Sequence, residues 1–256
     1  MRTSMRSAAV AATAVSLALL VTACGGGEKS DGKGDKAGGT AAPGTSATSA
    51  PAARTLSDAE LEKAIVERAD LKGHQVQKTE TGDVVPAASV TADKAACTPI
   101  AHAMSFLSPG SPAASAERKV LEEPKKDTSA SPEDALLGGL GARVTAVTLG
   151  SYDGQGAQEA FASVKKAGAE CAGGFQVVHL KEKTKVAKVA PETVTAGEEA
   201  VAFTVTTDME GQPFVSKLVV FRQGNTLASF STISLVPGGV KELPQAVIDA
   251  QAAKLS

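Results

Sequence analysis

The feature that most constrains this chain is an apolar run over residues 8–20 that ends in the stretch Leu20-Val21-Thr22-Ala23-Cys24. Arg2 and Arg6 precede the run, and no acidic residue occurs before the cysteine. A positive start, a short apolar centre and small residues at the end are typical of a secretory signal peptide. The run is shorter than the roughly 20 residues that a helix needs to cross a bilayer, which argues against an uncleaved membrane anchor. We therefore expect residues 1–23 to be removed and the rest of the chain to lie outside the cytoplasm.

The cysteine at the end of this segment makes the signal more specific. The pattern Val21-Thr22-Ala23-Cys24 resembles the lipobox of bacterial lipoproteins, in which the cysteine becomes the first residue of the mature chain. The resemblance implies that cleavage falls between Ala23 and Cys24 and that the Cys24 thiol carries a lipid such as palmitate. The lipid would hold the protein on the outer face of the cell membrane. The alternative is cleavage by the ordinary signal peptidase, which would give a free secreted protein.

A linker is expected directly after the lipidated cysteine. Residues 24–54 contain Cys24 followed by small and polar residues, with no large apolar side chain. Such a segment cannot bury enough surface to offset its ordering entropy, so we expect it to be disordered. As a random coil it would span roughly 30 Å. The remaining residues, 55–256, are numerous enough for one folded domain with a sizeable core.

The cysteine count predicts one disulfide in this domain. The sequence has three cysteines, and acylation of Cys24 leaves Cys97 and Cys171 as the one possible intradomain pair in an oxidising compartment. Cys97 lies at the entrance of one predicted helix, and Cys171 lies at the core-facing end of another. A bridge between them would contribute roughly 4–5 kcal/mol in the chain-entropy model. The alternative is two buried, inert thiols.

Helical spacing and capping signals predict four helices in the domain. The first begins after the cap Ser57, with Glu60 placed for a capping box, and is expected to end near Leu71. The other three helices are expected after the cap Thr98, over 157–171 and over 240–250.

Alternating apolar and polar residues predict the strands. They are expected over 74–78, 118–121, 143–149, 175–180, 184–189, 200–206, 215–222 and 227–235. The last three are joined by short turns and should form an antiparallel meander. We therefore expect the α+β class, with an antiparallel sheet that packs on one face against about four helices, as a single domain behind a disordered tether.

No catalytic or metal-binding constellation is predicted, and no cofactor. His74, His102 and His179 fall on three different predicted elements, whereas a zinc site needs clustered ligands. A cysteine nucleophile would need a free thiolate, and no G-x-S-x-G or S-x-x-K motif stands in a strand–turn–helix setting. Glu198 and Glu199 are neighbours at the start of a predicted strand. Their carboxylates should therefore point to opposite faces and fail to converge.

Composition argues against two further classes of partner. The formal net charge is −2, so nucleic acid has no electrostatic support. The absence of Trp and the single Tyr, Tyr152, argue against stacking platforms for single-stranded nucleic acid or carbohydrate. The turn over residues 153–156 could offer amide groups to an anion at a helix start, or it could simply connect two elements.

Several segments of the domain resemble one known group of extracytoplasmic domains. The whole arrangement is similar to the extracellular sensor domain of PknH-type receptor kinases and to related lipoproteins of high-GC Gram-positive bacteria. The resemblance implies an α+β domain with a cleft and a binding role. The segments that carry it are 95–100, 147–161 with 169–171, 196–203 and 219–227.

These observations lead to a membrane-anchored, extracytoplasmic and non-catalytic module that binds or senses a ligand of the cell envelope. A small molecule or a cell-wall component is the expected ligand class, and no ligand-binding residue or oligomeric state is predicted. Two alternatives are kept. One is an envelope hydrolase whose site assembles only in the fold, and the other is a carrier of apolar ligands or lipids.

Overall fold

The computed structural model describes residues 54–79, 85–123, 142–234, 236 and 238–256. The predicted signal peptide and almost all of the predicted linker lie outside the described residues. The helices are α1 (Asp58–Ala64), α2 (Thr98–Met104), α4 (Gly156–Glu170) and α5 (Gln245–Leu255), with short 3-10 helices η1 (Arg68–Asp70), η2 (Ala87–Ser89) and η3 (Ala95–Cys97). The strands are β1 (His74–Lys78), β2 (Val90–Ala92), β3 (Ala114–Glu122), β4 (Val144–Ser151), β5 (Phe175–His179), β6 (Glu182–Glu192), β7 (Glu199–Met209), β8 (Gln212–Gln223) and β9 (Thr226–Ile233).

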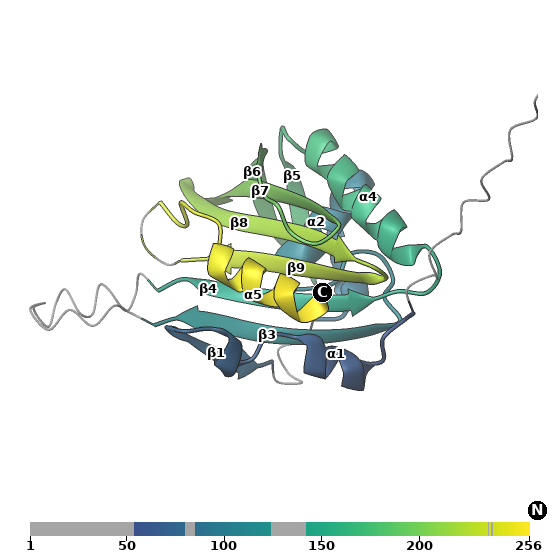
Figure 1. Ribbon diagram of the computed structural model, residues 1–256. Coiled ribbons are helices and arrows are strands. Elements are labelled where there is room, and N and C mark those ends of the chain that lie inside the picture. Colours follow the sequence, from purple (N-terminus) through teal and green to yellow (C-terminus); the bar gives the residue numbers. More distant parts are fainter. Residues whose placement is uncertain (1–53, 80–84, 124–141, 235, 237) are drawn as a thin grey trace, which may run out of the picture. The chain divides into compact units, whose positions relative to one another are not determined.

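The nine strands form one sheet in the order β1-β3-β4-β9-β8-β7-β6-β5-β2, and every neighbouring pair is antiparallel (Figure 1). The five strands from β5 to β9 are neighbours both in sequence and in space. The predicted three-strand meander is therefore part of a longer one. The α+β class, the antiparallel sheet and the four helices are confirmed.

The expectation that the helices share one face of the sheet is wrong. Adjacent residues on a strand point to opposite faces, and β8 is apolar on both. Leu218 and Val220 join a core with α2 and α4, whereas Val219 and Phe221 join a second core with α1 and α5. Figure 1 shows α5 lying across the sheet at β9 and β4. Because both faces of the central strands carry apolar side chains, both faces need a helical cover.

The first helix begins as predicted but ends earlier than predicted. Ser57 caps α1, and its backbone N–H donates to Glu60 Oε2 at 2.9 Å, which completes the capping box. The helix ends at Ala64 instead of continuing to Leu71. The reason lies in α5, because Gln251 is fully buried and replaces the missing helical hydrogen bonds. Its Oε1 accepts from the Val66 N–H at 2.9 Å, and its Nε2 donates to the Ala64 carbonyl at 2.9 Å.

The last helix starts later than predicted. The apolar residue Val240 belongs to an extended approach, in which its N–H donates to the Val215 carbonyl at 2.9 Å beside β8. Pro244 then caps α5. A proline inside the helix would lack an N–H donor and clash with the preceding turn, so the helix can begin only after it. Val247 and Ala250 keep their predicted places within the helix.

Tyr152 follows β4 and is 1% exposed, and its hydroxyl donates to the Pro109 carbonyl. Burial raises the pKa of this phenol well above its ordinary value. The unfolded chain should lose the phenolic proton near the ordinary pKa of about 10, while the folded chain keeps it. The stability contributed by the neutral phenol is therefore lost as the pH rises above that value.

Because the sequence has one Tyr and no Trp, tyrosinate absorbance reports on Tyr152 alone. We expect the native protein to show no tyrosinate near pH 10, and to ionise only at higher pH or together with unfolding. The same chain in denaturant should titrate near the ordinary value. An alkaline absorbance titration of both samples checks this, and superimposable curves would contradict the buried phenol.

Candidate binding groove

A groove of about 470 Å³ lies between the C-terminal half of α4 and the point where β6 separates from β7. Its volume is in the range of small-molecule sites, which is about 300–1,000 Å³. Apolar atoms make up most of its surface. The lining consists of Lys165, Gly168, Ala169 and Ala172 from α4 and its end, residues 191–194, and residues 200–203.

The helical wall of the groove follows from helix periodicity. Lys165, Gly168 and Ala169 stand at positions i, i+3 and i+4 of α4, which share one face, and Ala172 follows the end of the helix. A Cβ at Gly168 would clash with the Phe203 ring, so this ring packs directly on the helix backbone. The two alanines beyond it are too small to fill the space beside the ring. The hollow therefore results from small side chains on α4.

The opposite wall forms where the sheet opens. The register between β6 and β7 ends at the pair Glu192–Ala202, although β7 itself begins at Glu199. Pro191 lies at this end and has no N–H to continue a ladder. The chain after β6 then departs, and Val194 packs against the second core. The first residues of β7 are left facing the groove.

The two charged side chains that line the groove differ in their pairing: Glu192 has partners, and Lys165 has none among the described residues. The Glu192 carboxylate accepts hydrogen bonds from the Lys217 ammonium and the Thr204 hydroxyl. Burial raises the pKa of Glu192, but these hydrogen bonds outweigh burial, and its pKa lies below the ordinary value. Lys165 is exposed and has no hydrogen bond or ion pair within the part of the chain that the structure describes. Its neighbour Lys166 pairs with Glu170 at 3.6 Å.

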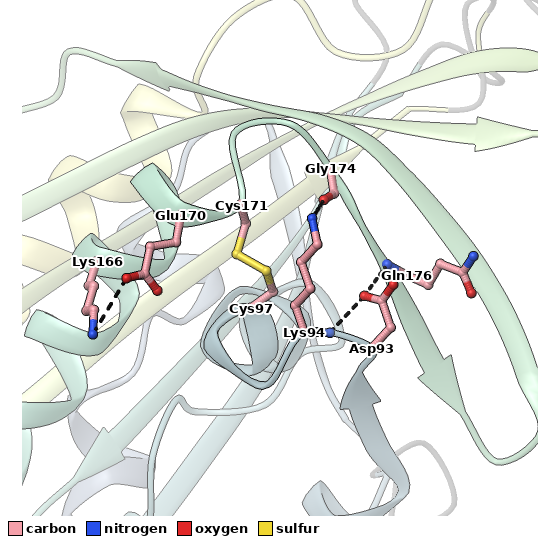
Figure 2. The surroundings of a disulfide bond; sticks show 8 residues. All are labelled: Asp93, Lys94, Cys97, Lys166, Glu170, Cys171, Gly174 and Gln176. Atoms are coloured by element: carbon pink, nitrogen blue, oxygen red, sulfur yellow. Dashed lines mark hydrogen bonds and ion pairs between the residues drawn. A yellow bond between two sulfur atoms is a disulfide. The ribbon is translucent and has the colours of Figure 1, made fainter.

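A disulfide fixes the end of the groove helix. Cys97 and Cys171 are bonded, both are buried, and their Cα atoms lie 5.9 Å apart. The bond joins the start of α2 to the residue that ends α4 (Figure 2). Beside it, Lys94 Nζ donates to the Gly174 carbonyl at 2.8 Å. The pairing agrees with the one that the cysteine count predicts.

The histidines belong to three different elements, β1, α2 and β5. His74 Nδ1 is 2.9 Å from the Lys72 carbonyl, and His102 Nε2 is 3.1 Å from the Val90 carbonyl. Within the described ranges, no three His, Cys, Asp or Glu side chains are grouped closely enough to hold a metal ion. The predicted lipidation and cleavage residues, Ala23 and Cys24, lie outside the described part.

Glu198 and Glu199 do converge, against the sequence expectation. Arg222 Nη1 is 2.6 Å from Glu198 Oε2, and Arg222 Nε is 2.8 Å from Glu199 Oε1. Glu198 precedes β7 and follows Gly197, whose φ of 53° redirects the chain, so strand alternation does not apply to the pair. Both carboxylates meet one cation. They form an ion-pair cluster that ties β7 to β8.

The turn before α4 is hydrogen-bonded to the start of the described chain. Thr55 Oγ1, at the start of the described chain, lies 2.8 Å from Asp153 Oδ1 and 2.9 Å from the Tyr152 carbonyl. Ser151 Oγ also accepts from the Leu56 N–H at 2.7 Å. These contacts hold the entry of the domain beside the end of β4.

Two other hollows contain side chains that form ion pairs. One of about 500 Å³ contains Glu62, whose carboxylate pairs with Arg118 at 2.9 Å and with Lys78 at 3.2 Å. The other, of about 150 Å³, contains Arg143, which pairs with Glu122 at 2.6 Å. The groove beside α4 combines a mainly apolar surface with Lys165, which has no ion pair among the described residues.

No helix among the described residues is long and apolar enough to cross a membrane. No family model matches the chain, and no curated protein matches it. Among solved structures, the chain is similar to the extracellular domain of PknH from Mycobacterium tuberculosis, with 10% identity and a TM-score of 0.46. The similarity covers 79% of this chain and 97% of that chain. The neighbour belongs to the group that the sequence resemblance named.

Proposed function

We propose that this chain is an extracytoplasmic binding or sensing module that a lipid on Cys24 holds at the outer face of the cell membrane. Residues 1–23 serve as the signal peptide, 24–54 as the lipidated linker and 55–256 as the binding domain. The order of positive start, apolar run, small residues and cysteine supports this arrangement.

The groove beside α4 is the observation that carries the binding role. It has the volume of a small-molecule site, an apolar lining and few polar groups, which is the usual composition of such sites. Its walls belong to a helix whose end is fixed by a disulfide, to the end of β6 with the two residues after it, and to the first part of β7, which pairs with β8. A site on rigid elements is preorganised, so little ordering entropy is lost when a ligand binds.

Of the two alternatives, the apolar-ligand carrier is the second candidate, because the groove lining is mainly apolar. The groove is open at the surface, which favours reversible binding over sequestration of a lipid. The hydrolase has less support. Within the described residues the rings of His74 and His102 hydrogen-bond with backbone carbonyl groups, so a Ser–His pair has no support.

Native mass spectrometry of the purified domain tests the binding role. Ala169→Trp places a large ring in the groove and should abolish any co-purified ligand mass that the wild type retains. Ala162→Trp is the matched control, because Ala162 is exposed two turns earlier on α4 and does not line the groove. Equal ligand retention by both variants, or no ligand on any sample, would contradict the site.

The anchor has its own test. Cys24→Ala removes the acceptor thiol, so the protein should leave the membrane fraction and lose labelling by radioactive palmitate. The wild type expressed in the same cells is the control. If the wild-type protein carries no palmitate label, the lipid anchor is contradicted, whereas the proposed binding role of the groove is unaffected.

A further inference from the structure

We propose that the groove beside α4 binds amphipathic anions, molecules with an apolar body and one anionic head group that pairs with Lys165. This inference rests on the proposed binding function of the same groove. It adds the chemical class of the ligand and the residue that selects it.

The apolar part of the ligand is set by the groove floor. The Phe203 ring lies against the backbone at Gly168, and Val194 and Val201 also line the groove with aliphatic surface. An alkyl chain in this space would remove its own surface and that of the lining from water, which is favourable in proportion to the area buried. A strongly polar ligand would leave its donors and acceptors unpaired against these side chains.

The charge of the ligand is set by which charges at the groove are free. Lys165 is the cation of the lining, and no partner holds it among the residues that the structure describes. Glu192 is the carboxylate of the lining, but Lys217 and Thr204 already bind it. A cationic ligand would therefore compete with a formed ion pair, whereas an anionic ligand gains one. Lys165 lies one helical turn before Gly168, at the N-terminal end of the part of α4 that lines the groove.

Calorimetric titration of the domain with three ligands of one chain length tests the proposal. Decanoate carries a carboxylate, decyl phosphate carries a phosphate, and decanol carries no charge, each used below its micelle concentration. We expect both anions to bind about three- to fivefold more tightly than decanol, as one exposed ion pair allows. The stronger of the two anions identifies the preferred head group. The advantage should shrink as salt is added, because the charge is at the surface.

Two variants assign the effect to one residue. Lys165→Gln should reduce anion affinity to that of decanol and leave decanol binding unchanged. Lys166→Gln is the matched control, since Lys166 is the next residue, is exposed and pairs with Glu170 away from the groove lining. Equal affinities of all three ligands for the wild type would overturn the charge selection but leave the binding groove in place. Failure of all three to bind, or binding unaffected by Ala169→Trp, would overturn the groove itself.

Discussion

A Cys97→Ser, Cys171→Ser double variant is expected to lose about 2–5 kcal/mol of its free energy of unfolding, the usual range for a native disulfide in an exported protein. The bond links residues 74 positions apart, so its removal frees a long loop in the unfolded chain. In the folded state it joins the start of α2 to the end of α4 inside the larger core, where both sulfur atoms are buried. Two serines there would also bury hydroxyl groups among apolar side chains.

Chemical unfolding with and without reductant measures this loss. The wild type should lose stability on reduction, whereas the double variant should show no dependence on redox conditions. A Cys97→Ala, Cys171→Ala variant is the control for buried hydroxyl groups, and it should still be less stable than the oxidised wild type. Two free thiols in the denatured, unreduced wild type would contradict the bond in solution.

Local signals in the sequence predict much of this fold. The spacing of Ala157, Phe161, Val164 and Gly168 predicts the inward face of α4, and all four are buried. The capping box at Ser57 and Glu60 places the start of α1. Strand β1 occupies the predicted residues 74–78. These features depend on residues within a few positions of one another, so the sequence pattern alone contains them.

Structural features that depend on residues distant in the sequence cannot be predicted from such local patterns. The end of α1 is set by Gln251, which is 185 residues from the Val66 N–H that it satisfies. The second helical layer could not be predicted from the sequence of β8, because an apolar run does not show which elements cover each face of the strand. Strand β6 likewise extends well beyond the predicted 184–189, since pairing with β7 continues to Glu192.

The groove depends partly on local sequence and partly on residues that are distant in the sequence. The small residues Gly168 and Ala169 on one side of α4, and Ala172 after its end, are visible in the sequence and indicate a helix end with little side-chain volume. Their consequence depends on the Phe203 ring, which comes from β7 and fills only part of the space beside them. The isolation of Lys165 is also a tertiary property, because it follows from the absence of an acidic partner among the described residues.

Glu192→Gln is expected to lower the free energy of unfolding by about 2–3 kcal/mol, less than the 3–5 kcal/mol typical of a fully buried pair because Glu192 is partly exposed. The Lys217 side chain is 6% exposed and points from β8 toward Glu192 and Thr204. Without the carboxylate, its ammonium keeps a hydroxyl partner but no opposite charge. The matched control is Glu170→Gln, which removes an exposed ion pair with Lys166 and should change stability by less than about 0.5 kcal/mol.

A double variant distinguishes the loss of the Glu192–Lys217 ion pair from the cost of leaving the Lys217 ammonium buried without an opposite charge. Glu192→Leu with Lys217→Met replaces both ions by apolar side chains and should recover most of the stability that Glu192→Gln loses.

The pH dependence gives a second readout, because the folded pKa of Glu192 lies below its unfolded value of about 4.3. The stability from this carboxylate is present above that value and is lost as the pH falls through the folded pKa. Urea unfolding of each variant across this acidic range should therefore show a shallower decline in Glu192→Gln than in the wild type. Equal losses for Glu192→Gln and Glu170→Gln would mean that the buried Lys217 does not depend on Glu192.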